Sequence, residues 1–167
     1  GILVFDLPDL PQQGGHHVRV FNNKVINNNT PNFAPEGNIV GEVPSGSGIM
    51  VMANSHVEVF ENRIENNGTT GIAVVSYADD YVDKSYYPHP RSIQIHDNEY
   101  INNGKNPDIE SNDLARLLFE LSNGKMPDIF WDGVVPVTQM LFGQNQEDKM
   151  IIDEYGSPSI ITLDPIK

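Results

Sequence analysis

Residues 18–29 of the chain read VRVFNNKVINNN, and this stretch returns twice, as VEVFENRIENNG over 57–68 and as IQIHDNEYINNG over 93–104. Each copy holds two short runs of alternating or mostly apolar residues, and each run is followed by a corner that contains asparagine. Such runs, bounded by turn residues, predict very short strands. Three copies of one unit predict a repeat architecture, because a single unit cannot bury its own apolar face.

A second motif alternates with the first, reading GILVF over 1–5, GIMVM over 48–52 and GIAVV over 71–75. Parallel stacking of the units would bury the apolar residues and let the strands hydrogen-bond from rung to rung, about 4.8 Å apart. The inward residues then form two columns, which are Val18, Val57 and Ile93, and Val20, Val59 and Ile95.

Polar residues at equivalent repeat positions test this alignment. Asn23, Asn62 and Asn98 share one position, and stacked asparagine amides can hydrogen-bond along such a ladder, so we interpret them as structural. Outward positions on adjacent rungs carry opposite charges, which is mildly stabilising across strands. These pairs are Arg19 with Glu58, and Arg63 with Glu99.

The pattern resembles the right-handed parallel β-helix superfamily with the pectate-lyase-like fold, and more narrowly the bacterial parallel β-helix repeat proteins of unassigned role. The resemblance covers residues 1–133 and implies an all-β solenoid of about four to five rungs with long loop insertions. We expect residues 134–167 to form a last rung or a C-terminal cap. One fold of this kind hosts many activities, so the resemblance alone does not assign one.

One short α-helix is expected in an insertion at about residues 105–127. Ser111 or Asn112 can cap its start and Gly124 its end. Its apolar stripe consists of Leu114, Leu117, Leu118 and Leu121.

Composition excludes several classes of function. The chain has 167 residues and a net charge of −13, with ten Lys and Arg against 23 Asp and Glu, which argues against nucleic acid and anionic membrane surfaces. It has no cysteine, so disulfides, thiolate catalysis and iron–sulfur sites are excluded. No apolar run approaches the roughly 18 residues of a membrane span.

The first residues lack the basic start and cleavage site of a signal peptide, and we interpret Gly1 as a processing or fragment boundary. We expect a periplasmic or extracellular bacterial location, as part of a larger exported protein. An uncapped first rung would expose a sheet edge, which predicts possible end-to-end self-association.

Loops alternate in length at both recurring corners of the rungs. At the first corner a long loop (6–16), a short turn (53–55) and a second long loop (76–91) follow one another. Two long loops on either side of a short turn predict a groove with a low floor, about 10 Å wide.

At the second corner the order is again long (30–47), short (68–70) and long (105–127). Here the outward residues Ile26 and Ile101 are apolar, and we expect the long loops to fold back over them.

The loop 76–91 carries the strongest candidate chemistry, in Tyr87, His89 and Arg91. Proton abstraction beside a uronate carboxylate needs a base, often His or Tyr, and a cation for the developing charge. The run loosely resembles the Asp-Pro-His element of mannuronan C-5 epimerases, but Tyr87 stands before Pro88 where that element has aspartate.

Further residues at this corner are candidates for substrate binding. Tyr81 and Tyr86 could form a sugar-stacking platform, or they could pin the loop to the rungs. His17 and His56 fall on adjacent rungs beside the same corner, where they could contact a glycan or share a metal, or simply be solvated.

Three aspartates of this loop, Asp79, Asp80 and Asp83, could hold a Ca²⁺ ion, which prefers oxygen ligands. The alternative is a solvated acidic loop. Asp128 and Asp132 could be a glycosidase-like pair of carboxylates, and the alternative is that they are turn residues beside a buried Trp131.

The sequence therefore predicts a module that binds an extended polysaccharide, or that binds and processes it as a lyase or uronate epimerase. Ca²⁺ would bridge an acidic glycan to an acidic protein. The alternative is a non-catalytic structural or protein-interaction scaffold. Bound Ca²⁺ would favour the first, and indifference to chelators the second.

Overall fold

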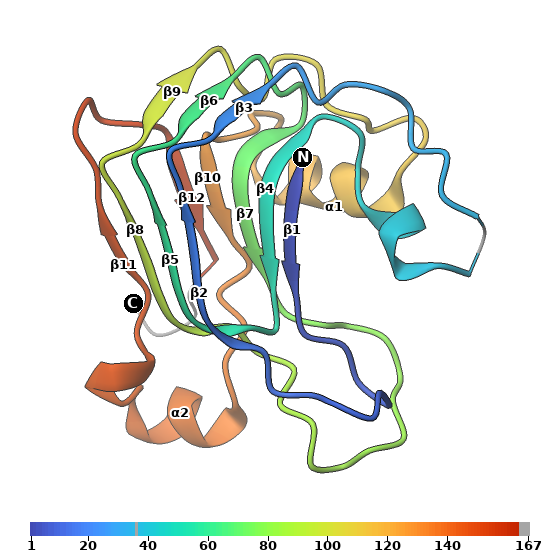
Figure 1. Cartoon of the computed structure of the whole chain (residues 1–167), viewed down its shortest axis with the longest axis vertical. Helices are drawn as coiled ribbons and strands as arrows, with labels where there is room; N and C mark the ends of the chain where they lie inside the picture. Colours follow the sequence, from blue (N-terminus) through green and yellow to red (C-terminus); the bar gives the residue numbers. More distant parts are fainter. Residues whose placement is uncertain (36, 164–167) are drawn as a thin grey trace.

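The computed structural model describes residues 1–35 and 37–163, which are mostly β, with three parallel sheets and two short α-helices (Figure 1). Sheet A consists of β1 (Ile2–Phe5), β4 (Ser47–Met52), β7 (Thr70–Val75), β10 (Ile129–Trp131) and β12 (Ile160–Thr162). Sheet B consists of β2 (His16–Phe21), β5 (Ser55–Phe60), β8 (Arg91–His96) and β11 (Ile151–Asp153). Sheet C consists of β3 (Lys24–Ile26), β6 (Arg63–Glu65) and β9 (Glu99–Ile101).

The chain passes through sheets A, B and C in that order three times, and each strand pairs in parallel with its equivalent on the next circuit. After β9, the strands β10 and β11 extend sheets A and B, and β12 then adds to sheet A. The helical segments between the strands are η1 (Ile39–Glu42), α1 (Asp113–Leu121), α2 (Val137–Phe142) and η2 (Gln146–Asp148).

The strand register confirms the alignment of the repeats. Val57 lies between Val18 and Ile93, and Val59 lies between Val20 and Ile95. Val57 and Val59 have exposed fractions of 1% and 0%, so both columns belong to the core. The predicted charge pairs also form, with N–O distances of 2.7 Å for Arg19–Glu58 and 3.7 Å for Arg63–Glu99.

The predicted asparagine ladder runs along the corner between sheets B and C. The Nδ2 of Asn23 donates to the Oδ1 of Asn62 at 2.9 Å, and Asn62 donates to Asn98 in the same way at 2.9 Å. A second ladder follows sheet C, in Asn28, Asn67 and Asn103. The inner members of both ladders are buried, so their amides satisfy one another in place of water.

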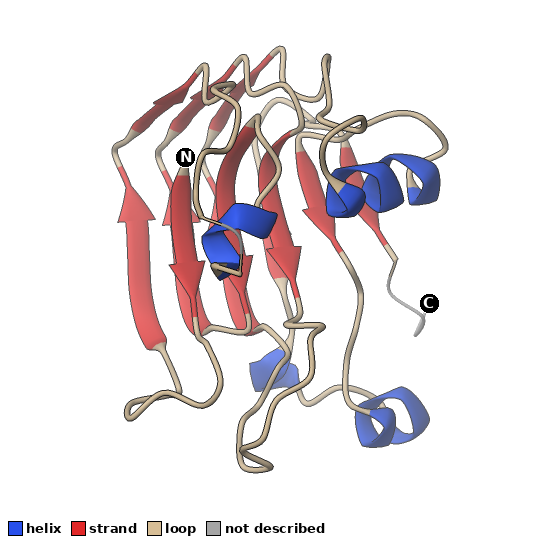
Figure 2. Cartoon of the chain, turned by 90° about the vertical axis from the view of Figure 1, so that its right-hand side faces the viewer, coloured by secondary structure: helices blue, strands red, loops and turns tan. Residues whose placement is uncertain are grey.

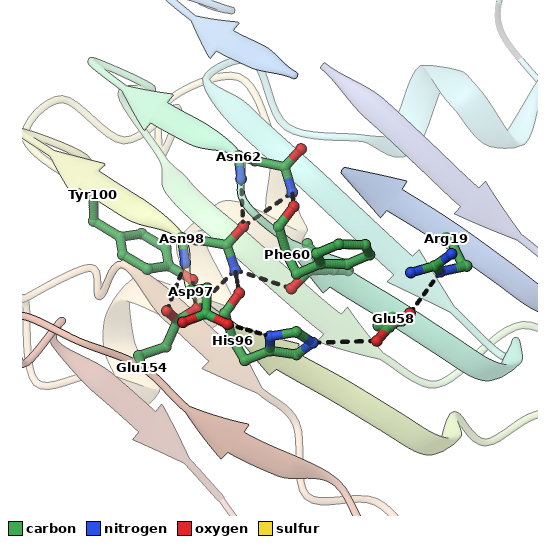
Figure 3. A network of polar contacts seen from close by, with 10 residues as sticks. Arg19, Glu58, Phe60, Asn62, His96, Asp97, Asn98, Tyr100 and Glu154 are labelled. Atoms are coloured by element: carbon green, nitrogen blue, oxygen red, sulfur yellow. Dashed lines mark hydrogen bonds and ion pairs between the residues drawn. The ribbon is translucent and has the colours of Figure 1, made fainter. Parts of the chain in front are cut away.

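Both ladders end on a carboxylate. The Nδ2 of Asn98 donates to Oε1 of Glu154 at 2.8 Å (Figure 3). The Nδ2 of Asn103 donates to Oδ1 of Asp128 at 3.2 Å. Each amide in a ladder donates toward the C-terminal end, so the last amide requires an acceptor. An ionised carboxylate can only accept hydrogen bonds, so it can accept from the last amide and end the ladder.

A glycine column starts the strands of sheet A. A Cβ atom at Gly48 would lie 2.4 Å from the carbonyl oxygen of Gly71, and one at Gly71 would lie 2.6 Å from that of Asp128. The glycine in the GI motif is therefore required by the close approach of the next rung.

Apolar residues pack against both faces of sheet A, so every residue of β4 and β7 is buried. One face packs in the core between the sheets, and the other is covered by η1, α1 and the long loops (Figure 2). The loops were expected over Ile26 and Ile101, and this was wrong. They cover the outward side of sheet A, where Met50, Met52 and Phe130 offer more apolar surface.

The helix expected in the insertion at about residues 105–127 is α1. Asn112 is its N-cap and accepts a hydrogen bond from the backbone N–H of Ala115 at 2.9 Å. The expectation of only one α-helix was wrong, because α2 follows Pro136. This helix has no side-chain cap, and none of its residues is buried, so no amphipathic pattern marks it in the sequence.

Residues 134–163 hold α2, η2, β11 and β12, and residues 164–167 of the expected cap lie outside the described part. No helix in the described residues is long and apolar enough to cross a membrane.

Candidate functional site

The first corner contains a pocket of about 380 Å³ between the two long loops. The turn after β4, represented by Ala53 and Ser55, contributes to its lining, as the long–short–long order predicts. The pocket also takes residues from both loops, which are Asp6, Leu10, Pro11, Gln13, Gly14, Gly15, Asp83, Ser85, Tyr86, Tyr87, His89 and Arg91. Its volume falls in the lower part of the range of about 300–1,000 Å³ that is usual for small-molecule sites.

The two loops also touch each other. The carboxylate of Asp9 accepts hydrogen bonds from the backbone N–H groups of Val82 and Asp83, at 3.0 and 2.8 Å. The Nε2 of Gln13 donates to Oδ2 of Asp83 at 2.9 Å. The loops therefore form a pocket with bridged walls, where the sequence had predicted an open groove.

The three residues that the sequence nominated for catalysis all line this pocket. The rings of Tyr87 and His89 meet edge to face at 5.5 Å between centroids. The guanidinium carbon of Arg91 lies 4.5 Å from the centroid of the Tyr87 ring. The Nδ1 of His89 is 3.1 Å from Oγ of Ser76, which fixes the ring orientation and leaves Nε2 as the other polar atom.

The surroundings of His89 and Tyr87 shift the pKa values of these two groups in opposite directions. Burial lowers the pKa of His89, so the imidazole is neutral at pH 7 and can accept a proton. Burial raises the pKa of Tyr87, with a further contribution from Asp148, while the positive charge of Arg91 opposes the shift. Tyr87 is therefore a neutral phenol at pH 7, which can donate a proton or hydrogen bond. Of these two groups, only His89 can accept a proton at pH 7.

The two other tyrosines differ in position. Tyr86 is buried, and its hydroxyl donates to the backbone oxygen of Asp6 at 2.7 Å, so it ties the second loop to the end of β1. Its ring also contributes to the pocket wall. Tyr81 packs edge to face on Tyr86 at 5.1 Å and is absent from the described lining. Both rings thus hold the loop in place, and only Tyr86 is at the pocket.

The three loop aspartates are dispersed. Asp83 lines the pocket, and hydrogen bonds from Ser85, and then from Gln13, hold its pKa below the ordinary value. Asp79 lines a different cavity, and Asp80 is exposed. Nowhere in residues 1–35 and 37–163 do three or more His, Asp or Glu side chains gather in a group that could hold a metal ion. The calcium site stays a prediction.

His17 and His56 stack in parallel, with ring centroids 4.7 Å apart, on the solvent face of sheet B. Both have a positive φ, 58° and 52°, and Ser92 on the next rung has 54°, so this corner repeats one left-handed conformation. Neither histidine is among the pocket-lining residues described, although Ser55 beside His56 is. A glycan contact for them stays a prediction.

Two residues of the pocket were missed by the sequence reasoning. Asp6 has an exposed fraction of 8%, and its Oδ2 accepts a hydrogen bond from the backbone N–H of Gly14 at 3.0 Å. The Oε1 of Gln13 is buried in the described structure without a hydrogen-bond partner. The signal for Asp6 was its place directly after an apolar strand, at the corner where the groove was expected.

The pair Asp128 and Asp132 has a structural explanation. Asp128 ends the second asparagine ladder and also accepts hydrogen bonds from Ser159. Asp132 accepts hydrogen bonds from the backbone N–H groups of Ser76 at 2.6 Å and Val134 at 3.0 Å. Trp131 between them is buried, with an exposed fraction of 7%. Both carboxylates are thus engaged by the fold.

Comparison with known proteins gives no relative. No family model matches the chain, and neither a curated protein nor a solved structure matches it significantly. The function has to be argued from the pocket itself.

Proposed function

We propose that the three sheets are the faces of a right-handed parallel β-helix, and that its first-corner pocket binds an acidic glycan and abstracts a proton from it. The observation that carries this proposal is that Tyr87, His89 and Arg91, chosen from the sequence, line one pocket. A neutral base, a neutral phenol and a guanidinium are the groups that β-elimination or epimerisation of a uronate requires.

The charged residues that line the pocket favour a uronate over a neutral sugar as the ligand. Arg91 is the one Lys or Arg side chain in the described lining, and a guanidinium binds a carboxylate well. Asp6 and Asp83 stand in the same pocket and can accept hydrogen bonds from sugar hydroxyls. The unpartnered Oε1 of Gln13 is a further acceptor for a hydroxyl. These groups favour a ligand rich in hydroxyls with a single carboxylate at the guanidinium.

In the proposed step, Nε2 of His89 removes the proton beside the uronate carboxylate. Arg91 stabilises the negative charge that develops on the carboxylate oxygens. In elimination, Tyr87 donates its proton to the leaving oxygen as the bond from the sugar carbon to that oxygen breaks. In epimerisation, Tyr87 donates its proton to the same carbon from the opposite face of the sugar ring. The bridged loops favour the end of a chain or a short oligosaccharide over the interior of a long polymer.

The test is titration of the protein with short oligosaccharides of uronic acids, followed by calorimetry, together with an ultraviolet assay for unsaturated sugar ends. We expect Arg91→Gln to weaken binding about tenfold or more, as loss of a charged hydrogen-bond partner does. His89→Ala should retain binding and abolish turnover. Arg116→Gln, on the exposed side of α1, is the matched control. Equal affinity in wild type and Arg91→Gln, or binding of no uronate at all, would contradict the proposal.

The second candidate, a scaffold that assembles end to end, is favoured by one observation. Among the described residues, the strands β1, β2 and β3 are the edge strands of their sheets and lie at the same end (Figure 1). Phe21, the last ring of a stack with Phe60 and His96, is 44% exposed there. Sedimentation at rising protein concentration tests this, and a monomer at all concentrations would exclude it.

A further inference from the structure

A second cavity, of about 440 Å³, lies on the outward face of sheet A, apart from the Tyr87 pocket. Its floor is apolar and consists of Met50, Met52, Val75 and Phe130. One wall comes from α1, where Leu114, Leu117, Leu118 and Leu121 line the cavity. Ile39 and Val43, in and beside η1, also line the cavity. Both α1 and η1 lie over the outward face of sheet A (Figure 2). The cavity is thus a hydrophobic slot between two helical segments and a rigid sheet.

Several of these walls are incompletely covered. Leu117 and Leu121 are 50% and 44% exposed, although both line the cavity. A contiguous apolar surface that is left exposed in this way is typical of a binding site, because exposure of each apolar side chain to water costs free energy. The volume is in the range of about 300–1,000 Å³ that small-molecule sites occupy.

The charged residues in the described lining of this cavity are all acidic. Glu42 and Asp79 are exposed at its edge, and Asp132 is half-buried. In the described part of the chain, the side chains of Glu42 and Asp79 make no ion pair or hydrogen bond, and no Lys, Arg or His lines the cavity. Tyr77 lines the same cavity, and burial first, and then the charges of Asp79 and Glu42, raise the pKa of its phenol.

We infer that this cavity binds a small molecule with an apolar body and one cationic head, such as an alkylammonium. The apolar body would lie along the sheet A floor between α1 and η1, where it replaces water on the leucine and methionine side chains. The ammonium would stand at the rim, close to Glu42, Asp79 and the phenol ring of Tyr77, which can also take part in a cation–π contact. An anion of the same length would meet the free carboxylates of Glu42 and Asp79 and no counter-charge in the described lining.

The site is independent of the proposed glycan pocket. Two contacts join the sites: Ser76 lines the apolar cavity and contacts His89 through Oγ, and Tyr77 lines the cavity and packs edge to face on Tyr86 of the pocket. No residue with a candidate role in proton abstraction lines the apolar cavity. Failure of one site would therefore leave the other unaffected.

The test compares three probes of equal chain length, decyltrimethylammonium, decanol and decanoate, each below the concentration at which it forms micelles. Methionine methyl groups labelled with ¹³C report the location of binding by NMR. Met50 and Met52 lie in the floor, while Met140 is on α2 and Met150 packs against the inner core. We expect the cationic probe to shift the signals of Met50 and Met52 and to leave those of Met140 and Met150 in place.

The affinity ratio tests the charge argument. Exposed ion pairs are individually weak, so the two exposed carboxylates, Glu42 and Asp79, should together make the cationic probe about tenfold tighter than decanol. Decanoate should bind more weakly than decanol. Equal affinities for the cationic and anionic probes, or unshifted Met50 and Met52 signals, would overturn the inference.

Variants separate the charge from the apolar slot. The double variant Glu42→Gln and Asp79→Asn should lower the affinity for the cationic probe to that for decanol. Both side chains are exposed, so the fold is expected to persist. Asp80→Asn removes a neighbouring charge that does not line the cavity, and should change nothing. A loss of affinity in Asp80→Asn equal to that in the double variant would point to long-range attraction by the net charge of −13 and would overturn the site.

Discussion

Glu154 closes the first asparagine ladder, and its replacement by glutamine tests how much that closure contributes to stability. Its Oε2 accepts the backbone N–H of Asn98 at 2.8 Å, and its Oε1 accepts the Nδ2 of Asn98 at 2.8 Å and the hydroxyl of Tyr100 at 2.7 Å (Figure 3). Three donors thus converge on one carboxylate. Burial, and then the charge of Glu154, raise the pKa of Tyr100, so its hydroxyl remains a donor at neutral pH.

The magnitude follows from the donors and acceptors that glutamine has. A glutamine side chain keeps one acceptor oxygen and presents an NH₂ group where the second oxygen stood. One N–H of Asn98, whose exposed fraction is 5%, would then face another donor. A buried polar group without a partner costs about 1–3 kcal/mol, and because Glu154 is itself half-buried we expect about 2 kcal/mol. For a chain of this size that is a fall in Tm of about 4–8 °C.

The assay is equilibrium unfolding in urea. Trp131 is the only tryptophan and is buried against the inner core, so its fluorescence follows loss of the fold. Glu120→Gln, at an exposed position on α1, is the matched control and should change stability by less than about 0.5 kcal/mol. Tyr100→Phe removes one of the three donors and should cost less than Glu154→Gln. If Glu154→Gln is no more destabilising than Glu120→Gln, the ladder does not need its carboxylate end.

Three further predictions concern the rungs. Val59→Asp should destabilise by about 3 kcal/mol or more, because it places an unpaired charge at a position with 0% exposure, and a wild-type melting temperature would refute the register. Hydrogen bonds, first to Asp97 and then to Glu58, raise the pKa of His96, so its stabilising contribution is present below its ordinary pKa and is lost as pH rises through the raised pKa. The stability difference between wild type and His96→Gln should therefore be larger at pH 5.5, about one unit below an ordinary pKa near 6.5, than at pH 8, about 1.5 units above it, and a constant difference would contradict this. Glu61 has a φ of 53°, so Glu61→Asn should stabilise by about 0.5 kcal/mol in urea unfolding, whereas Glu61→Ala should not.

The sequence predicted the parallel strand pairing well because the information for it is local and repeated. The alternation in 18–29, 57–68 and 93–104 sets which side chains point inward, and a shift of one residue would turn every valine outward. Asn62 adds a second constraint, since its amide is satisfied only when Asn23 and Asn98 are in register. Two independent patterns therefore select the same pairing.

The path of the long loops could not be predicted in the same way. Whether they cover Ile26 and Ile101 or the outward face of sheet A depends on which exposed apolar surface is larger in three dimensions. Period-two alternation identifies one buried face, but in β4 and β7 both faces are apolar. The GIMVM and GIAVV runs already contain this signal, because a strand with one solvated face would show polar residues at Met50 and Ala73.

The pocket illustrates where sequence reasoning stops. The alternation of long and short loops predicted its location, and Tyr87, His89 and Arg91 were close in sequence, so their proximity needed no tertiary information. Gln13 joins them from a segment remote in the chain, through the contact of its Nε2 with Asp83. Loop-to-loop contacts of this kind have no periodicity and become visible only in the structure.

The bridging of the loops decides between two forms of the glycan proposal. A polymer that lies across the rungs must pass between loop 6–16 and loop 76–91, and the hydrogen bonds from Val82 and Asp83 to Asp9 stand in that passage. These contacts are exposed, so each is weak, and they can open at a modest free-energy cost. Asp9→Ala should therefore raise the affinity for long chains and leave the affinity for disaccharides unchanged, as calorimetry with chains of increasing length would measure. Equal effects on both would mean that the bridge shapes the pocket itself and does not limit access to it.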